Sequence, residues 1–393
     1  MSVFENIISI KLNIKKHTRK GEKEMKKKAL VLLLSTVMVL AGVVGCAAPA
    51  EEAKTEEPKT EEAAEEVAEE ATEEATEETA DGDKLTIGIS VDFSFASRLA
   101  TIKGLEKAGE AAGVDMIELQ AEGDAQEQNN QIDELIKKGV DGLLICPIDL
   151  NTIKSALMAA EQANIPVVLY DRDSPDATNV LTAVTCGATD DGYQGGKYIA
   201  DQLDAQGKDK YVIAELRGPE NDDIGVQRSA GFNKAVTEVL GDKAEVVVVE
   251  TGAWDTPTAQ ANLAAALQSN PDITAVFCGT DSFFPGVETA LSEVGKQFNV
   301  GEEGHVVVTG INGSAEGYDA VVNKIADGTV VMNCPDTGVA SMEALLAYIA
   351  DGTTPERTII VPSAFYTGED IEANKDKIWG CWPQADLELK YNK

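Results

Sequence analysis

Residues 164–173 read NIPVVLYDRD and set the pattern by which the rest of the chain is interpreted. Pro166 closes a helical stretch, and the apolar residues 167–170 after it have the character of a short buried strand. Asp171 and Arg172 follow directly at the carboxyl end of that strand, which is where ligands bind in open α/β sheets. A carboxylate accepts hydrogen bonds from neighbouring hydroxyls and a guanidinium donates a planar fork of them, so the pair predicts a site for a small polyhydroxylated molecule. A solvated ion pair in a loop is the alternative.

The same strand signal recurs along the first half of the chain, with helical patterns between. Predicted strands cover residues 85–91, 115–119, 142–145, 167–170 and 180–185, and predicted helices cover 98–112, 125–138 and 153–163. Strands that alternate with helices of this length indicate right-handed βαβ units and a parallel sheet.

A second series of the same kind follows, without a close sequence repeat. Its predicted strands are 211–216, 244–250, 275–278 and 306–311, and its predicted helices are 191–206, 224–240, 257–269, 284–294 and 315–327. The roughly 310 residues after residue 83 exceed what one compact core usually holds, which favours two lobes. An extended stretch at 330–333, a helix at 337–350 and an extended tail then predict that the chain returns to the first lobe before it finishes in the second.

The N-terminal region has the character of a targeting segment. Met25 is a better start than Met1, because three lysines at 26–28 and the apolar run 29–44 follow it. That run is short for a spanning helix, and the small residues before Cys46 resemble a bacterial lipobox, in which the cysteine is lipidated. An uncleaved anchor helix is the alternative, and both place the remainder outside the cytoplasm.

Residues 47–83 form an acidic, low-complexity segment. They hold 16 acidic residues against Lys54 and Lys59, which accounts for 14 of the formal net charge of −35. With no large apolar periodicity, the segment cannot bury enough surface to offset its ordering entropy, and we expect a solvated tether. A nucleic-acid partner is not expected, since the chain has no basic stripe to neutralise phosphates.

The residues that support most enzyme chemistry are scarce. His17 and His305 are the only histidines, so neither a His-based catalytic triad nor a zinc site is expected. No phosphate-binding loop or dinucleotide fingerprint occurs. The five cysteines after Cys46 are odd in number and widely spaced, which predicts no metal cluster. The sequence thus predicts a protein that is not an enzyme and has no cofactor or metal.

Seven segments resemble, in order and spacing, the sugar-binding lipoproteins of bacterial ABC importers, in the ribose-, xylose- and galactose-binding family of periplasmic binding proteins. They are IGISVDFSF (87–95), ANIPVVLYDRD (163–173), RSAGF (228–232), GAWDTPTAQANL (252–263), PDITAVFCGTD (271–281), GINGSAEG (310–317) and VVMNCPD (330–336). The resemblance covers the chain from Lys84 to its end.

The resemblance implies an α/β protein of the type I periplasmic-binding-protein fold, with two Rossmann-like lobes whose parallel sheets are joined by a three-strand hinge. The expected boundaries are a signal segment at 1–46, the tether at 47–83, a first lobe at 84–189 plus 334–361, and a second lobe at 190–333 plus 362–393. It further implies a monomer that binds one sugar, an ABC permease as partner and a lipid anchor in the membrane.

The family's binding positions fall, in the first lobe, on Asp92, Phe93, Phe95, Asp171 and Arg172. Aromatic faces suit the C–H side of a sugar ring, although either phenylalanine could instead fill the core of the lobe. Asp171 and Arg172 match the family's Asp-Arg pair directly.

In the second lobe the family's positions fall on Asn221 or Asp222, Arg228, Trp254, Asp281, Asn312 and Asn333. Arg228 could instead be a surface residue of its helix, since the ribose binder has its arginine two positions earlier. Where the ribose pattern has aspartate this chain has Asn312, and where it has glutamine this chain has Asn333. Asparagine donates as well as accepts, so ribose is doubtful and a hexose or cyclitol is favoured.

Two other functions fit parts of this pattern. A sensor would present a sugar or autoinducer to a membrane receptor, and a sugar-active enzyme would use two of the carboxylates at 92, 171, 222 and 281 as an acid/base pair. A cytoplasmic repressor is excluded by the lipobox and by the lack of an N-terminal helix-turn-helix.

We predict that Cys46→Ser releases or mislocalises the protein, because the substitution removes the thiol that would carry the lipid. Fractionation of cells that express the two forms measures this. Equal membrane association of an unprocessed Cys46→Ser chain would show instead that the anchor is an intact helix.

Overall fold

The computed structural model describes residues 84–220, 222–252 and 254–391. The signal segment with Cys46, the acidic tether and Asn221 lie outside these described residues. Among the described helices, none is both long enough and apolar enough to cross a membrane.

The first lobe is built on a six-stranded sheet in which every described pairing is parallel. Its strand order is β2-β1-β3-β4-β5-β11. The strands are β1 (Thr86–Val91), β2 (Asp115–Gln120), β3 (Gly142–Ile145), β4 (Val167–Tyr170), β5 (Thr182–Thr185) and β11 (Thr358–Ile360). Its helices are α2 (Ala96–Ala112), α3 (Ala125–Lys137), α4 (Ile153–Gln162) and α10 (Cys334–Asp351).

The second lobe repeats this topology. Its strand order is β7-β6-β8-β9-β10-β12, with β12 antiparallel to β10. The strands are β6 (Tyr211–Arg217), β7 (Ala244–Glu250), β8 (Ile273–Cys278), β9 (Val307–Asn312), β10 (Gly328–Val331) and β12 (Ala364–Thr367). Its helices are α5 (Ala188–Gln206), α6 (Asp223–Leu240), α7 (Thr256–Ser269), α8 (Phe284–Glu293) and α9 (Ala315–Val322). The prediction of one α/β architecture built twice is confirmed.

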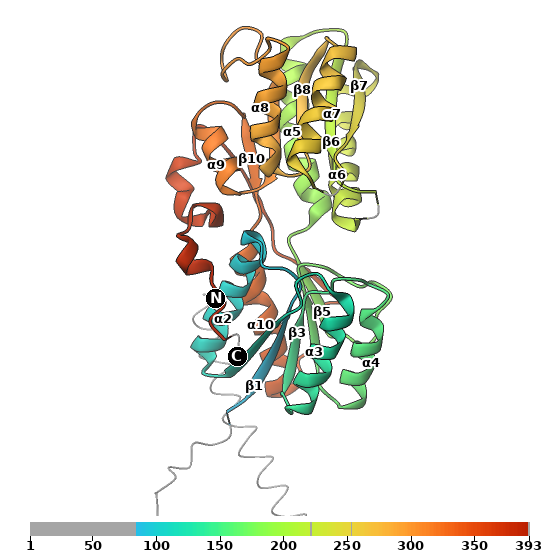
Figure 1. Cartoon of the computed structure of the whole chain (residues 1–393), viewed down its shortest axis with the longest axis vertical. Coiled ribbons are helices and arrows are strands. Elements are labelled where there is room, and N and C mark those ends of the chain that lie inside the picture. Colours follow the sequence, from blue (N-terminus) through green and yellow to red (C-terminus); the bar gives the residue numbers. More distant parts are fainter. Residues whose placement is uncertain (1–83, 221, 253, 392–393) are drawn as a thin grey trace, which may run out of the picture. The chain divides into compact units, whose positions relative to one another are not determined.

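Each sheet is buried on both faces because its strands are apolar at nearly every position. In the first lobe, α2 and α10 cover one face and α3 and α4 the other (Figure 1). Alternate residues of one strand reach opposite cores, as Val168 packs toward α10 while Val167 packs toward α4. Such continuous apolar runs are typical of parallel sheets covered on both sides.

Glycines allow two pairs of helices to approach unusually closely. An added Cβ on Gly104 of α2 would lie 1.9 Å from the Pro335 carbonyl oxygen, and one on Gly338 of α10 would lie 2.0 Å from that of Thr101. The second lobe uses the same device, since α5 and α6 meet through Gly192 and Gly231. Because backbone faces backbone at these crossings, no side-chain movement could make room for a larger residue.

The predicted helix at 315–327 is shorter than expected. It ends at Val322, where Asn323 caps it and Lys324 takes a positive φ of 61°. The left-handed conformation stops the helix five residues before its predicted end, and the chain then enters β10 at Gly328, two residues before the predicted extended stretch at 330–333.

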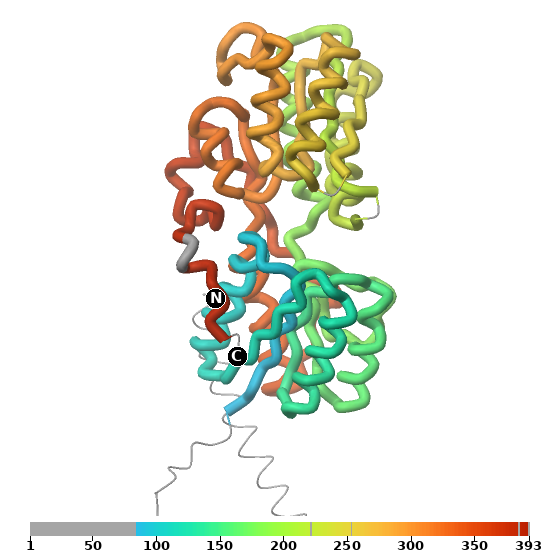
Figure 2. The backbone as a smooth tube through the Cα atoms, in the orientation of Figure 1, coloured from blue at the N-terminus to red at the C-terminus, as the bar shows by residue number. Residues whose placement is uncertain are grey.

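The C-terminal tail also differs from expectation, since it is not simply extended and does not end on the second lobe. After β12 it forms three short 3-10 helices, η3 (Glu372–Lys377), η4 (Trp379–Cys381) and η5 (Gln384–Leu387). It then runs along the first lobe beside α2 (Figure 2). The backbone amide of Glu118 donates to the Tyr391 carbonyl at 3.1 Å, and the Tyr391 amide donates to the Glu118 carboxylate at 2.9 Å. Assignment of all of 362–393 to the second lobe is therefore wrong for its last described residues, which end at Tyr391.

We predict that Gly104→Ala lowers the melting temperature by several degrees, because the new methyl group overlaps the Pro335 carbonyl and overpacking costs about 1–3 kcal/mol. Thermal unfolding followed by circular dichroism measures this. Gly368→Ala is the control, since its added Cβ would lie 3.7 Å from the nearest atom. Equal melting temperatures for the two variants would contradict the close helix crossing.

Candidate functional site

A cavity of about 1510 Å³ is lined by residues of both lobes. Many of these residues lie on loops at the carboxyl ends of the strands, the edge at which open α/β sheets bind ligands. The lining includes eight of the predicted site residues: Phe93, Phe95, Asp171, Arg172, Asp222, Arg228, Trp254 and Asn312.

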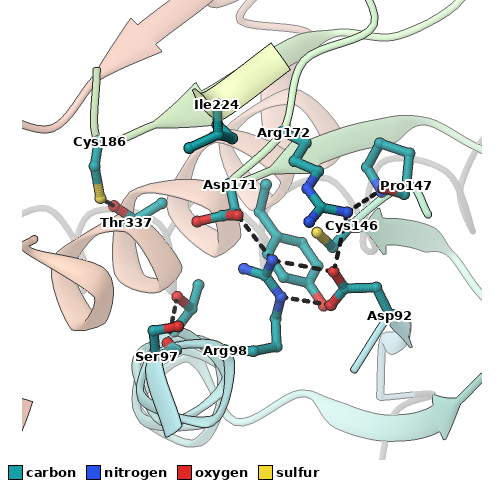
Figure 3. Close-up of polar contacts among 12 residues, drawn as sticks. Asp92, Ser97, Arg98, Cys146, Pro147, Asp171, Arg172, Cys186, Ile224 and Thr337 are labelled. Atoms are coloured by element: carbon teal, nitrogen blue, oxygen red, sulfur yellow. Dashed lines mark hydrogen bonds and ion pairs between the residues drawn. The ribbon is translucent and has the colours of Figure 1, made fainter. Parts of the chain in front are cut away.

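The first-lobe wall is organised by an arginine that the sequence analysis did not identify. Arg98, on the first turn of α2, donates from Nε to Asp92 Oδ1 at 2.5 Å and from Nη2 to Asp171 Oδ2 at 2.7 Å (Figure 3). Arg172 approaches the same group, with Nη1 3.3 Å from the Pro147 carbonyl oxygen and 3.5 Å from Asp92 Oδ2. Two carboxylates and two guanidiniums thus form one network of balanced charge.

Exposure separates the supporting members of this network from those that can touch a ligand. The Asp92 and Arg98 side chains are 0% and 2% exposed, whereas those of Asp171 and Arg172 are 14% and 25% exposed. Burial opposes ionisation of Asp171, but the charge and hydrogen bond of Arg98 outweigh it and hold the pKa of Asp171 below its ordinary value. Asp171 is therefore an ionised acceptor at neutral pH.

Asp92 is consequently placed differently from the expectation of direct ligand contact. It is fully buried, and its carboxylate accepts hydrogen bonds from Arg98 and forms an ion pair with Arg172. Its role in this geometry is to position the two arginines.

Phe93 and Phe95 extend the wall with aromatic surface. Their rings stack with centroids 5.6 Å apart, and Phe95 is 47% exposed. Phe95 therefore does not fill the core. Phe93 is partly buried against Gly123, yet it also lines the cavity.

The second-lobe wall is built around Arg228 and Trp254. Arg228 is only 5% exposed and donates to the Gly279 carbonyl at 2.7 Å and to Asn312 Oδ1 at 2.9 Å, so it is not a surface residue of α6. Its guanidinium lies 5.8 Å from the Trp254 ring centroid. Within the described residues, Nε of Arg228 has no hydrogen-bond acceptor.

Asp222 connects the tryptophan to the helix that carries Arg228. The Trp254 indole N–H donates to Asp222 Oδ2 at 2.8 Å, while Asp222 Oδ1 accepts from the Ile224 amide at 3.0 Å and caps α6. The neighbouring Asp255 caps α7 instead, accepting from the Thr258 amide at 2.8 Å. Asp222 thus orients the Trp254 ring, whereas Asp255 caps the helix that follows Trp254.

Strained backbone is concentrated at this cavity. Asp171, Trp254 and Asn312 have φ values of 66°, 56° and 136°, in a region that side chains other than glycine rarely adopt. Such conformations cost about 1–3 kcal/mol each and persist where surrounding contacts enforce them, which is common at ligand sites. The hydrogen bond from the Asp171 amide to the Val184 carbonyl, at 2.7 Å, is one such contact.

Asp281 and Asn333 are also placed differently from expectation. Asp281 is fully buried, and its Oδ2 accepts from the amides of Gly313 and Ser314 at 2.8 and 3.1 Å. It thereby supports the loop after Asn312 without facing the cavity. Asn333 donates to Asp336 at the start of α10 at 3.0 Å and is absent from the cavity lining, where its neighbour Met332 is found instead.

Asp191, near the start of α5, is a second residue that the sequence analysis missed. It lies at the cavity and is fully buried, and neither carboxylate oxygen makes a hydrogen bond of ordinary geometry to the described residues. Burial raises the pKa of Asp191 to about 7, although Arg228 and the Ser363 hydroxyl act to lower it. No local sequence signal separates Asp191 from the exposed Asp190 beside it.

Comparisons with known proteins agree with this architecture. The chain is 28% identical to the ribose import binding protein RbsB of Bacillus subtilis (strain 168) over 280 residues, which cover 71% of this chain and 86% of the relative. It is 27% identical to the galactofuranose-binding protein YtfQ of Escherichia coli (strain K12) over 263 residues, with 64% and 79% covered.

Solved structures show the same fold. An ABC transporter solute binding protein from Bacillus halodurans C-125 with bound myo-inositol matches with a TM-score of 0.65 and 22% identity, over 76% of this chain and 100% of that one. One from Actinobacillus succinogenes 130z with bound D-allose matches with a TM-score of 0.64 and 23% identity, over 74% and 100%.

The family model described as a periplasmic binding protein domain matches residues 92–354, which span most of both lobes. Its members bind ligands and are not enzymes. With its twice-built α/β fold and a ligand-sized cavity lined from both lobes, the chain belongs to the periplasmic binding protein family.

Proposed function

We propose that this chain is the extracytoplasmic solute-binding subunit of an ABC importer and captures a monosaccharide or similar polyol. The observation that carries the proposal is the cavity itself, whose two walls combine fixed hydrogen-bonding groups with aromatic rings. The two relatives described above are named for ribose and galactofuranose, and the two solved structures hold myo-inositol and D-allose, all small polyhydroxylated molecules.

Each wall supplies complementary groups to such a molecule. Asp171 accepts hydrogen bonds from hydroxyls, and Arg172 donates to hydroxyl oxygens with the N–H groups that its neighbours leave unused. In the second lobe Arg228 lines the cavity, with its guanidinium held by the Gly279 carbonyl and by Asn312. Phe95 and Trp254 provide flat apolar surfaces for the C–H side of a ring.

The replacement of an acidic group by Asn312 favours a ligand other than ribose. Asn312 already accepts from Arg228 and donates to Thr280 Oγ1 at 2.8 Å. A side-chain amide both donates and accepts hydrogen bonds, whereas a carboxylate only accepts them. The two groups therefore favour ligands with different arrangements of hydroxyls. A hexose or a cyclitol remains our proposal for the ligand.

We further propose that the protein is a monomer held to the outer face of the membrane by a lipid on Cys46. The support is the sequence pattern at 25–46 and the extracytoplasmic character of the family. The acidic tether would then keep the two lobes away from the bilayer, since like charges extend a flexible chain.

We predict that Arg172→Ala and Trp254→Ala each weaken sugar binding by about tenfold or more. A charged hydrogen bond to a buried hydroxyl contributes roughly 1.5–3 kcal/mol, and an aromatic contact a similar amount. The test is calorimetric titration with whichever pentoses, hexoses and inositols raise the wild-type melting temperature. Arg217→Ala and Trp382→Ala are matched controls, because neither side chain lines the cavity.

Near-native affinity in both site variants would refute the site. If no sugar or polyol in the panel stabilised the wild-type protein, the proposed ligand class would be wrong. A fall in the ligand-free melting temperature of Trp254→Ala alone would show that the ring supports the lobe core.

We predict that Asp191→Asn stabilises the protein more at pH 8 than at pH 4. The native carboxyl has its pKa raised to about 7 from an ordinary 3.8, so between these values the native state holds a proton that the unfolded state has lost. Wild-type stability therefore falls as pH rises through this window, and asparagine removes that loss. Melting temperatures across pH 4–8 measure the effect, with the exposed Asp190→Asn as control. A pH-independent difference between Asp191→Asn and wild type would contradict the assignment.

A further inference from the structure

Two of the segments that connect the lobes each carry a buried cysteine, and the first of them, Cys186, also lines the cavity. Cys186 directly follows β5, where the chain first leaves the first lobe, and Cys334 is the first residue of α10, where it first returns. Both are buried, at 4% and 1% exposure. They are therefore distant in sequence but adjacent at the point where the lobes are joined.

The sulfur of Cys186 lies against the first turn of α10. Its Sγ is 3.2 Å from Thr337 Oγ1 (Figure 3). Thr337 is three residues after Cys334, and residues at that spacing share one face of a helix. Hydrogen bonding with the Cys334 thiol, together with burial, raises the pKa of Cys186 well above its ordinary value. Cys186 therefore lies against the helical turn that Cys334 begins.

The other described cysteines are placed elsewhere. Cys146 follows β3 of the first lobe, Cys278 ends β8 of the second lobe, and Cys381 is in the C-terminal tail. The odd number of thiols is therefore a pair and three separate cysteines.

We propose that Cys186 and Cys334 form a disulfide bond in the extracytoplasmic protein, a covalent modification that ties the end of β5 to the start of α10. Disulfides persist in such oxidising compartments. The oxidant would be another disulfide, of a small molecule or of an exchange protein. One cysteine thiolate attacks it and releases one thiol, and the second thiolate then attacks the mixed disulfide and releases the other. The protein loses two protons and two electrons, and the oxidant becomes two thiols.

The bond would act on the segments between the lobes. Gly187, with a φ of 82°, immediately follows Cys186, and Asn333 immediately precedes Cys334. The bond therefore lies on the first-lobe side of both connecting segments and fixes the distance between them. Gly187 and Asn333, which are next to the two cysteines, are not part of the bond. It also closes a loop that contains most of the second lobe, which restricts the unfolded chain.

Burial dictates when the bond forms. The raised pKa of Cys186 makes its thiolate scarce in the folded protein, and the thiolate is the reacting species. Oxidation is accordingly expected while the chain folds after export.

The test uses the full chain, exported to an oxidising compartment and purified without reductant. One sample is alkylated in denaturant before reduction and another after reduction, and the peptides of each are identified by mass spectrometry. We expect the peptides that contain Cys186 and Cys334 to be joined to each other and to be alkylated only after reduction. We also expect the melting temperature of the reduced protein to be lower by about 5 °C or more.

Three variants make the result specific to this pair. Cys186→Ser and Cys334→Ser should each abolish the effect of reductant on melting, whereas Cys278→Ser should retain it. The proposal is overturned if both peptides are alkylated before reduction, even after the protein is unfolded and refolded with oxidised glutathione. It is overturned equally if either cysteine is found joined to a different partner.

Discussion

The first-lobe wall of the cavity depends on the buried ion pairs of the Arg98 guanidinium with two aspartates. A cation without water must be compensated by nearby acceptors, and Asp92 and Asp171 provide them from the ends of β1 and β4. The same three groups fix the loop after β4 in which Asp171 has a positive φ. Arg98 therefore joins two strands and a helix at the edge where a ligand would lie. Both arginines line the cavity, and Arg172 is left as the more exposed cation of the two.

The second lobe reaches a similar result with different groups. Arg228 is held by a backbone carbonyl and by Asn312, and none of its hydrogen-bond partners among the described residues is a carboxylate. Asp281 is fully buried, and its carboxylate accepts from two backbone amides and from the Thr329 hydroxyl at 2.8 Å. It thereby fixes the backbone that follows Asn312. In both lobes a fully buried aspartate supports a partly exposed polar residue.

The fold was predictable because its signals are local, whereas the site depended on contacts between distant residues. Strands such as β3 and β4 are short apolar runs with clear ends, and both were predicted at their observed bounds. Arg98 was missed because its partners lie 6 and 73 residues away, and nothing in its own helix shows that it is buried. Asp281 was misassigned because a place after a strand does not show which way a side chain points. The tail after β12 has no periodicity, so its return to Glu118 was not visible in the sequence.

The pairing of Tyr391 with Glu118 has a mechanical consequence. Glu118 belongs to β2, which also pairs with β1, the strand at which the described chain begins. Both ends of the described chain are therefore held at one edge of the first sheet, and the second lobe is built from the chain between β5 and α10 together with β12. A pull on a chain attached ahead of residue 84 acts on the first lobe alone. A load applied there does not have to pass through the second lobe.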